Sequence, residues 1–120
     1  MTLPRLAIDG LWFREPSGRR VLLRGVNLGG DTKVPAGPDQ RTHLATDFSD
    51  HRTVSFVGRP FPLTEADLHF RRLAHWGFNC LRLLTTWEAV EHEGPGVYDT
   101  AYLDYLAEIG AEGFAVVADV

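Results

Sequence analysis

The chain of 120 residues lacks the features that define several classes of protein. Cys80 is the one cysteine, so no disulfide can form within the chain. No apolar run approaches the roughly 18 residues that a membrane-spanning helix needs. The first residues also lack the charged-then-apolar layout of a secretory signal peptide. We therefore expect no transmembrane segment and a cytoplasmic location.

Positive charge is scarce as well. The chain has 12 Lys and Arg against 16 Asp and Glu, which gives a formal net charge of −4, and the basic residues form no stripe. A nucleic-acid-binding domain depends on such a stripe, so nucleic acid is not an expected partner. The remaining composition is ordinary for a globular domain, with 44% hydrophobic and 23% charged residues, enough for one modest core.

Two turns, a strand and a long loop are predicted in the first half of the chain. Residues 6–14 alternate around Asp9–Gly10, a pair that favours two-residue hairpin turns, and a second turn follows at residues 15–18. The mostly apolar run at residues 21–28 is typical of a strand buried on both faces of a parallel sheet. Residues 29–62 are irregular, and a loop of this length is often functional. We expect it to cover the catalytic end, because it joins the carboxyl end of a strand to the next helix.

A helix is predicted after this loop because several signals agree. Thr64 can act as the N-cap, with Asp67 three residues later as a weaker form of the capping-box glutamate. Gly77 is placed to end the helix. The expected buried face repeats at helical spacing and consists of Ala66, Phe70 and Leu73.

The second half of the chain repeats the order of strand, loop and helix. Buried strands are predicted at residues 78–84 and 114–120, with a polar loop at residues 88–96 and a helix that begins near Asp99. Strands that alternate with helices indicate parallel β-α-β units. The apolar stripe of the second helix is expected to be Leu103, Leu106 and Ile109, and the closing glycines are expected to be Gly110 and Gly113.

Arg82 is the most informative polar residue, because sites in parallel β/α proteins lie at the carboxyl ends of strands. It stands between leucines in a strand that should be buried, and a buried guanidinium without an anionic partner costs several kcal/mol. A carboxylate is therefore expected beside it. The pair could be an ordinary ion pair at the end of the sheet, or Arg82 could orient a catalytic carboxylate.

Two other residues allow two interpretations each. Trp87 follows the same strand and could stack on the apolar face of a sugar ring, or it could pack beneath a loop. Asn27 could donate to a substrate hydroxyl, or it could form a turn before Gly29–Gly30. A metal site is not predicted, because a solvated acidic loop without ligand-type spacing is the better interpretation of Glu88, Glu91, His92 and Glu93.

These segments resemble a known family. Leu23–Gly30 and Trp76–Leu83, with Trp87, resemble the first two barrel strands of glycoside hydrolase family five, the cellulase-like family. Residues 32–35, 55–63 and 85–89 resemble its endoglycoceramidase-related branch, which includes glucosylceramide and steryl-glucoside β-glucosidases. The resemblance implies an α/β fold that is a partial (β/α)8 TIM barrel. About three of its strands and two of its helices would follow the short hairpin, in one domain over residues 1–120.

The resemblance also implies a retaining glycosidase whose acid/base and nucleophile glutamates follow the fourth and seventh strands. No residue of this chain is assigned either role. Arg82 matches the family's arginine near the nucleophile, whereas Asn27 and Trp87 match residues near the sugar. The expected partner is a glycoside or glycolipid substrate, and no metal or organic cofactor is implied, since two carboxylates suffice.

Two rival interpretations stay open, namely a cellulase-type endoglucanase of the same family and a non-catalytic remnant of a truncated gene. In either case we expect the 120-residue chain alone to be inactive, because the strands that bear the two glutamates are missing. We also expect it to self-associate, because its apolar strands would lack neighbours.

Overall fold

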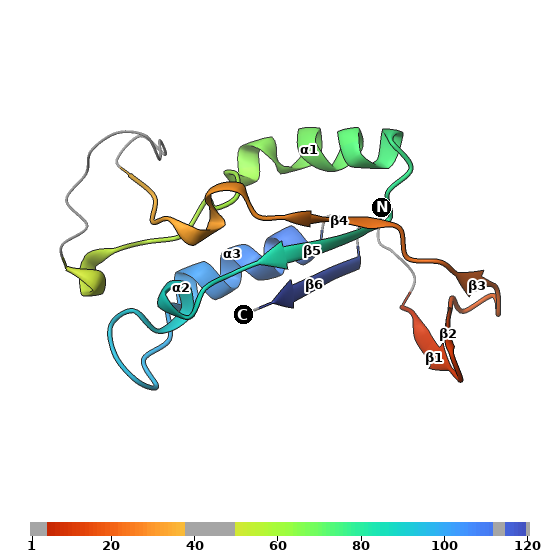
Figure 1. Cartoon of the computed structure of the whole chain (residues 1–120), viewed down its shortest axis with the longest axis horizontal. Coiled ribbons are helices and arrows are strands. Elements are labelled where there is room, and N and C mark those ends of the chain that lie inside the picture. Colours follow the sequence, from red (N-terminus) through yellow and green to blue (C-terminus); the bar gives the residue numbers. More distant parts are fainter. Residues whose placement is uncertain (1–4, 38–49, 112–114, 120) are drawn as a thin grey trace.

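The computed structural model describes residues 5–37, 50–111 and 115–119, which form two separate three-stranded sheets (Figure 1). The first sheet is antiparallel and has the order β1-β2-β3. It consists of β1 (Ala7–Asp9), β2 (Trp12–Arg14) and β3 (Arg20–Val21). The second sheet is parallel and has the order β4-β5-β6. It consists of β4 (Gly25–Leu28), β5 (Cys80–Leu84) and β6 (Ala115–Asp119).

The antiparallel sheet confirms the predicted hairpin, but its turn lies one residue later than expected. Asp9 pairs with Trp12, so the two-residue loop is Gly10–Leu11. Gly10 has a φ of +59°, a left-handed conformation that glycine adopts without strain. The second predicted turn, at residues 15–18, is confirmed by a backbone hydrogen bond of 2.8 Å across it.

The prediction of one buried strand over residues 21–28 is wrong. Its beginning belongs to β3, its end is β4, and the residues between them belong to neither sheet. The Asn79 side chain binds that intervening backbone: its Oδ1 accepts from the Arg24 N–H at 2.7 Å, and its Nδ2 donates to the Leu22 carbonyl at 2.9 Å. These two hydrogen bonds replace the lost sheet partners, so the chain can leave one sheet and enter the other.

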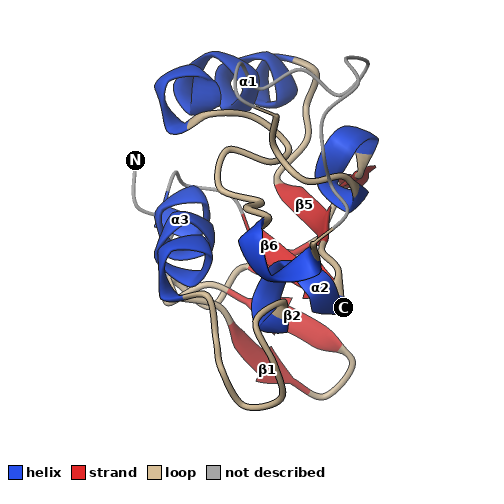
Figure 2. Ribbon diagram, turned by 90° about the vertical axis from the view of Figure 1, so that its left-hand side faces the viewer, coloured by secondary structure: helices blue, strands red, loops and turns tan. Residues whose placement is uncertain are grey.

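Two long helices cover one face of the parallel sheet (Figure 2). They are α1 (Leu63–His75) and α3 (Thr100–Ala111), which contact each other. Their buried side chains meet Leu81 of β5 in a single core. On the opposite face, Asn27 and Arg82 are exposed within the described part of the chain. The parallel order and the one-sided helices place the polar residues of the strands on an uncovered face.

Helix α1 confirms the predicted buried face but not the predicted cap. Ala66 and Phe70 are buried and Leu73 packs against the core. The N-cap is Pro62 rather than Thr64, and no side chain caps the first turn. Its C-terminus is as predicted: Gly77 has a φ of +87°, and its N–H donates to the carbonyl three residues back at 2.9 Å.

Helix α3 begins as predicted, and its predicted apolar stripe is confirmed at Ile109 and Leu106 but not at Leu103. Its buried residues are Tyr102, Tyr105 and Ile109, whereas Leu103 is exposed. The tyrosines can be buried because their hydroxyls have partners: Tyr102 lies 2.6 Å from the Thr85 hydroxyl, and Tyr105 donates to a backbone carbonyl at 2.6 Å. Gly110 lies inside the helix, and Gly113 lies outside the described residues.

The described parts of the long loop, residues 29–37 and 50–62, lie beyond the carboxyl ends of the parallel strands, at the end opposite the hairpin, as predicted (Figure 1). It contains two short 3-10 helices, η1 (Gly30–Lys33) and η2 (His51–Thr53). Parts of it enter the core, and the side chain of Phe56 is fully buried. This loop is therefore a structural layer as well as a cover. No helix in the described ranges has both the length and the apolar character to cross a membrane.

Candidate functional site at the carboxyl ends of the strands

Asn27 and Arg82 are register partners on adjacent parallel strands. Register partners project from the same face of a sheet, about 4.8 Å apart along the hydrogen-bonding direction. Asn27 lies inside β4, so its interpretation as a turn residue is wrong. The expected burial of Arg82 is also wrong, because strand alternation places Leu81 and Leu83 on the helix-covered face and Arg82 on the exposed one. The structure thus brings together two of the three predicted site residues.

Gly25 explains how these two strands approach so closely. A Cβ atom at this position would lie 2.4 Å from the carbonyl oxygen of Cys80, its partner in the register. Because that neighbour is backbone and cannot move aside, any larger residue would push the strands apart. Gly25 therefore helps to set the spacing of the pair formed by Asn27 and Arg82.

Trp87 is the third predicted site residue, and it begins a short helix, α2 (Trp87–Glu91), just beyond β5. This helix replaces part of the predicted polar loop, and Thr86 caps it by accepting from the Ala89 N–H at 3.2 Å. The Trp87 ring is 72% exposed, which contradicts packing beneath a loop in the described part of the chain. Its Nε1–H donates to the Glu91 carboxylate at 2.7 Å. The ring is thus oriented by its own helix and open to a ligand.

A hollow of about 560 Å³ adjoins the Trp87 ring. Its polar groups include the carboxylates of Glu88 and Glu91, which accept hydrogen bonds, and the His51 ring. Together with an aromatic face, this is the chemistry that holds a polyhydroxylated ring. The lining residues are His51, Trp87, Glu88, Glu91, His92, Gly94 and Pro95.

A buried guanidinium is found instead in the long loop, at Arg59, which the sequence did not single out. Arg59 is 2% exposed, its Nη1 donates to the Asp31 carboxylate at 3.0 Å, and its Nη2 donates to the Pro35 carbonyl at 3.3 Å. Arg59 thus ties two loop segments together through a buried ion pair and a hydrogen bond to the backbone. Arg59 was missed because a loop has no periodicity from which burial can be predicted.

His92 is a second residue that the sequence misplaced. It was predicted in a solvated acidic loop, but it is 8% exposed and its Nε2 lies 2.9 Å from the Asp99 carboxylate. A histidine seven residues before an aspartate gives no recognisable signal by itself. Within the described ranges, no group of three His, Cys, Asp or Glu side chains is arranged to hold a metal ion.

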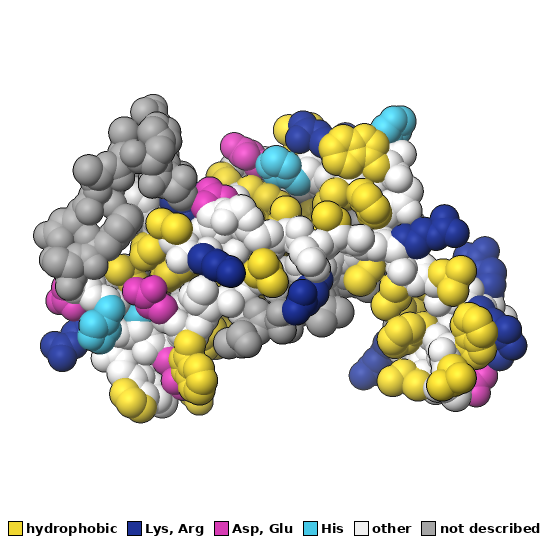
Figure 3. Space-filling view, viewed as in Figure 1, with side chains coloured by type: hydrophobic (Ala, Val, Ile, Leu, Met, Phe, Trp, Pro, Cys, Tyr) yellow, Lys and Arg dark blue, Asp and Glu magenta, His cyan; other side chains and the backbone are white. Residues whose placement is uncertain are grey.

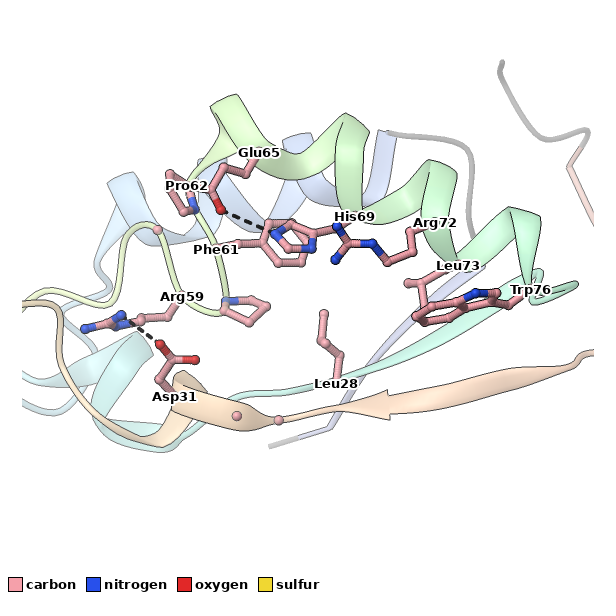
Figure 4. A pocket seen from close by; sticks show the side chains of 14 residues that line it. Leu28, Asp31, Arg59, Phe61, Pro62, Glu65, His69, Arg72, Leu73 and Trp76 are labelled. Carbon is pink, nitrogen blue, oxygen red and sulfur yellow. Dashed lines mark hydrogen bonds and ion pairs between the residues drawn. The ribbon is translucent and has the colours of Figure 1, made fainter. Parts of the chain in front are cut away.

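A second hollow, of about 540 Å³, lies between α1 and the end of β4 (Figure 4). Leu28, Phe61 and Leu73 point into it, and the His69 ring stacks on Phe61 with 4.5 Å between ring centroids. Arg72 lies at its rim. This hollow is on the helix-covered side of the sheet, so it is separate from the face that carries Asn27 and Arg82.

No protein-family model matches the chain, but curated fungal glycosidases do. It is 53% identical over 104 residues to a glucosylceramidase of Rhizopus delemar and 47% identical over 109 residues to a glucosylceramidase of Aspergillus fumigatus. It is 43% identical over 108 residues to an ergosteryl-beta-glucosidase of Saccharomyces cerevisiae. These matches cover 84%, 91% and 87% of this chain but only 15%, 14% and 14% of the respective relatives.

Solved structures give the same result. The chain matches a crystal structure of Cryptococcus neoformans sterylglucosidase 1 with a TM-score of 0.77 and 38% sequence identity. That match covers 95% of this chain and 17% of that one. A second structure of the same enzyme matches with a TM-score of 0.74 and 40% identity. The chain is therefore homologous to one segment of much longer enzymes that are named as glycosidases.

Proposed function

We propose that this chain is a substrate-facing segment of a β-glucosidase that hydrolyses a glycolipid, either glucosylceramide or a steryl glucoside. The observation that carries the proposal is the pair of Asn27 and Arg82, side by side on the exposed face of a parallel sheet. The names of the relatives supply the substrate class. None of the relatives described above is named as a cellulase, so the endoglucanase interpretation has less support.

The architecture supports a segment of a (β/α)8 barrel of glycoside hydrolase family five. The strand order β4-β5-β6 follows the sequence, and the helices cover one face. In a barrel the helices form an outer ring and the other face of the sheet points inward, whereas a doubly wound sheet has helices on both faces. Asn27 and Arg82 would then lie on the inner wall.

The mechanism that we propose is hydrolysis with retention of configuration. It needs two carboxyl groups about 5–5.5 Å apart, one as acid/base and one as nucleophile, and we assign neither to this chain. Arg82 would orient the nucleophile and stabilise its ionised form, because a guanidinium binds a carboxylate through two parallel hydrogen bonds. Asn27 would donate to a sugar hydroxyl and Trp87 would stack on the sugar ring. We further propose that the protein acts in the cytoplasm.

A chimeric enzyme tests the proposal. The matching segment of the Rhizopus delemar glucosylceramidase is replaced by the residues of this chain, and hydrolysis of glucosylceramide in mixed micelles is measured. We expect activity, and we expect Arg82→Lys to lower kcat roughly 100-fold with little change in KM, because lysine cannot make the two-pronged contact.

The matched control is Arg71→Lys, which changes an exposed arginine on α1 that pairs with Asp67. We expect this variant to keep the parent kcat. A folded chimera without activity would contradict the proposed function. Near-parental kcat in Arg82→Lys would show instead that Arg82 is a structural charge. Cello-oligosaccharides in place of glucosylceramide test the endoglucanase alternative.

A further inference from the structure

We propose that His92 and Asp99 form a positioning pair that fixes the orientation of Trp87. Neither residue touches the substrate in this proposal. They act through helix α2, which carries the Trp87 ring at its first position and is followed directly by His92. The consequence for substrate binding rests on the proposed function, but the positioning itself does not.

Helix α2 needs such support because it has only five residues. A helix of this length has almost no stability of its own, since the first turn costs more conformational entropy than its hydrogen bond returns. Its orientation therefore depends on contacts with the rest of the fold. Ala89 and Val90 pack it on the core, and several of its hydrogen bonds to the rest of the fold involve Asp99.

Asp99 joins α2 to α3 through its side chain and its backbone, and its carbonyl oxygen accepts from the Leu103 N–H of α3 at 3.1 Å. One carboxylate oxygen accepts from the Tyr102 N–H at 2.9 Å, which caps the first turn of α3. The other oxygen lies 2.9 Å from Nε2 of His92. The backbone N–H of Asp99 donates to the carbonyl of Val90, inside α2, at 2.8 Å. A single residue thus fixes the start of one helix and the end of another.

The network returns to the beginning of α2 through a tyrosine. The hydroxyl of Tyr102 lies 2.6 Å from that of Thr85, which follows β5 and precedes the capping residue Thr86. Both ends of α2 are therefore connected to α3. From a third side, Nδ1 of His51 in η2 lies 2.6 Å from the carbonyl oxygen of His92. Helix α2 is held by the strand before it, the helix after it and the long loop.

The tautomer of His92 follows from its surroundings. Its Nδ1 is buried and makes no hydrogen bond to any described residue. A proton on Nδ1 would be a buried donor without an acceptor, so the proton belongs on Nε2, where it is donated to Asp99. The pair is then a directed N–H···carboxylate bond, which is shorter and stronger than a bond between neutral groups.

The test uses the 120-residue chain with Trp12→Phe and Trp76→Phe, so that Trp87 is its one tryptophan. Time-resolved fluorescence anisotropy separates fast local motion of the ring from slow tumbling, and self-association changes only the slow component. In His92→Leu and Asp99→Asn we expect the fast amplitude to rise roughly twofold, because motions of a ring and a loosened turn fall in the ps–ns range. His92→Gln, which keeps a donor, should restore part of the difference.

Asp104→Asn is the matched control, since it makes the same chemical change at an exposed position of the same helix. Far-UV circular dichroism identifies variants that still fold, and Asp99→Asn keeps an oxygen for the Tyr102 N–H. Unchanged anisotropy in folded His92→Leu and Asp99→Asn would overturn the proposal. An equal change in Asp104→Asn would overturn it too, because the effect would not be specific to the pair.

The chimeric enzyme separates this proposal from the proposed function. If Trp87 contacts the sugar, Asp99→Asn should raise KM for glucosylceramide several-fold with a smaller change in kcat. A larger amplitude of fast motion in the anisotropy decay without a change in KM would support the positioning pair and contradict the role of Trp87 in binding. An inactive chimera would contradict the proposed function and leave the anisotropy result as the decisive evidence on positioning.

Discussion

The described loops beyond the carboxyl ends of β4 and β5 differ sharply from the hairpin sheet at the other end of the molecule. The loops have little regular structure, yet Phe56 and Arg59 are almost completely buried. The hairpin is regular, yet Leu11 is 98% exposed and Ile8 is 78% exposed. Figure 3 shows hydrophobic and basic side chains gathered over the hairpin. In this chain, regular backbone hydrogen bonding does not by itself bury side chains, and an irregular backbone does not prevent their burial.

The register of the hairpin explains its exposed apolar side. Ile8 pairs with Phe13, which pairs with Val21, so the three side chains form one row across the sheet. The opposite face is mixed: Arg14 forms an ion pair with Asp9, and the Arg20 guanidinium lies 4.6 Å from the centroid of the Trp12 ring. Among the described residues, the apolar row of the hairpin sheet is therefore left largely exposed, whereas the loops bury side chains such as Phe56 and Arg59.

Phe56→Ala should give the largest effect, because it removes a fully buried ring from the loop layer. We expect the free energy of unfolding to fall by about 4 kcal/mol, from lost burial and the cavity left behind. Urea unfolding of the chain or of the chimera measures this change. Phe13→Ala, the same substitution in the hairpin, is the control and should cost far less. Equal losses of unfolding free energy in the two variants would show that the loops and the hairpin do not differ in packing.

High pH should weaken the loop end selectively. Burial raises the pKa of Tyr102 and of Tyr105 above the ordinary value of 10.0. The folded chain then keeps phenolic protons that the unfolded chain releases, so the free energy of unfolding falls as the pH rises above about 10. Below that pH these residues contribute no pH dependence.

The Tyr105→Phe variant tests the assignment of this effect. At neutral pH it should be about 1 kcal/mol less stable, because its hydrogen bond to the Phe61 carbonyl is lost. Between pH 9 and pH 11 it should lose less stability than the parent chain. Unfolding monitored by circular dichroism at several pH values measures both changes. An identical alkaline loss in parent and variant would show that other groups are responsible.

Ile8→Ser should give the smallest effect on stability, within about 0.5 kcal/mol, since the side chain is largely exposed. Its effect on association should be larger, because it interrupts the apolar row of the hairpin. Size-exclusion chromatography with light scattering should show a larger monomer fraction than in the parent chain. Arg5→Ser, at an exposed residue outside the row, is the control. A strong loss of stability in Ile8→Ser would show that the hairpin is packed after all.

The fold was predictable where hydrophobic periodicity carries the information. The buried face of α1, the strand at residues 80–84 and the parallel order follow from spacing alone. The split between β3 and β4 could not be predicted, because it depends on the side chain of Asn79, more than 50 residues away in sequence. Helix α2 is too short to show a period.

The candidate site was predicted less completely than the fold. Asn27 and Arg82 were identified and lie together, but the argument from burial applied to Arg59. Burial in a strand alternates, so a run of leucines around a polar residue does not bury that residue. The pair of His92 and Asp99 was missed because its geometry arises from three separate elements. The roles proposed for Asn27, Arg82 and Trp87, and for the pair of His92 and Asp99, remain predictions.

The contacts that close the base of the long loop affect how well the loop tolerates insertions. The Ala36 N–H donates to the Ser55 carbonyl at 2.7 Å, and Arg59 binds the Asp31 carboxylate. These contacts hold the two ends of the intervening segment together. Lengthening a segment between fixed ends is inexpensive, since doubling a loop costs only about 0.6 kcal/mol. Added length between Ala36 and Ser55 therefore raises the entropic cost of closing this loop only slightly.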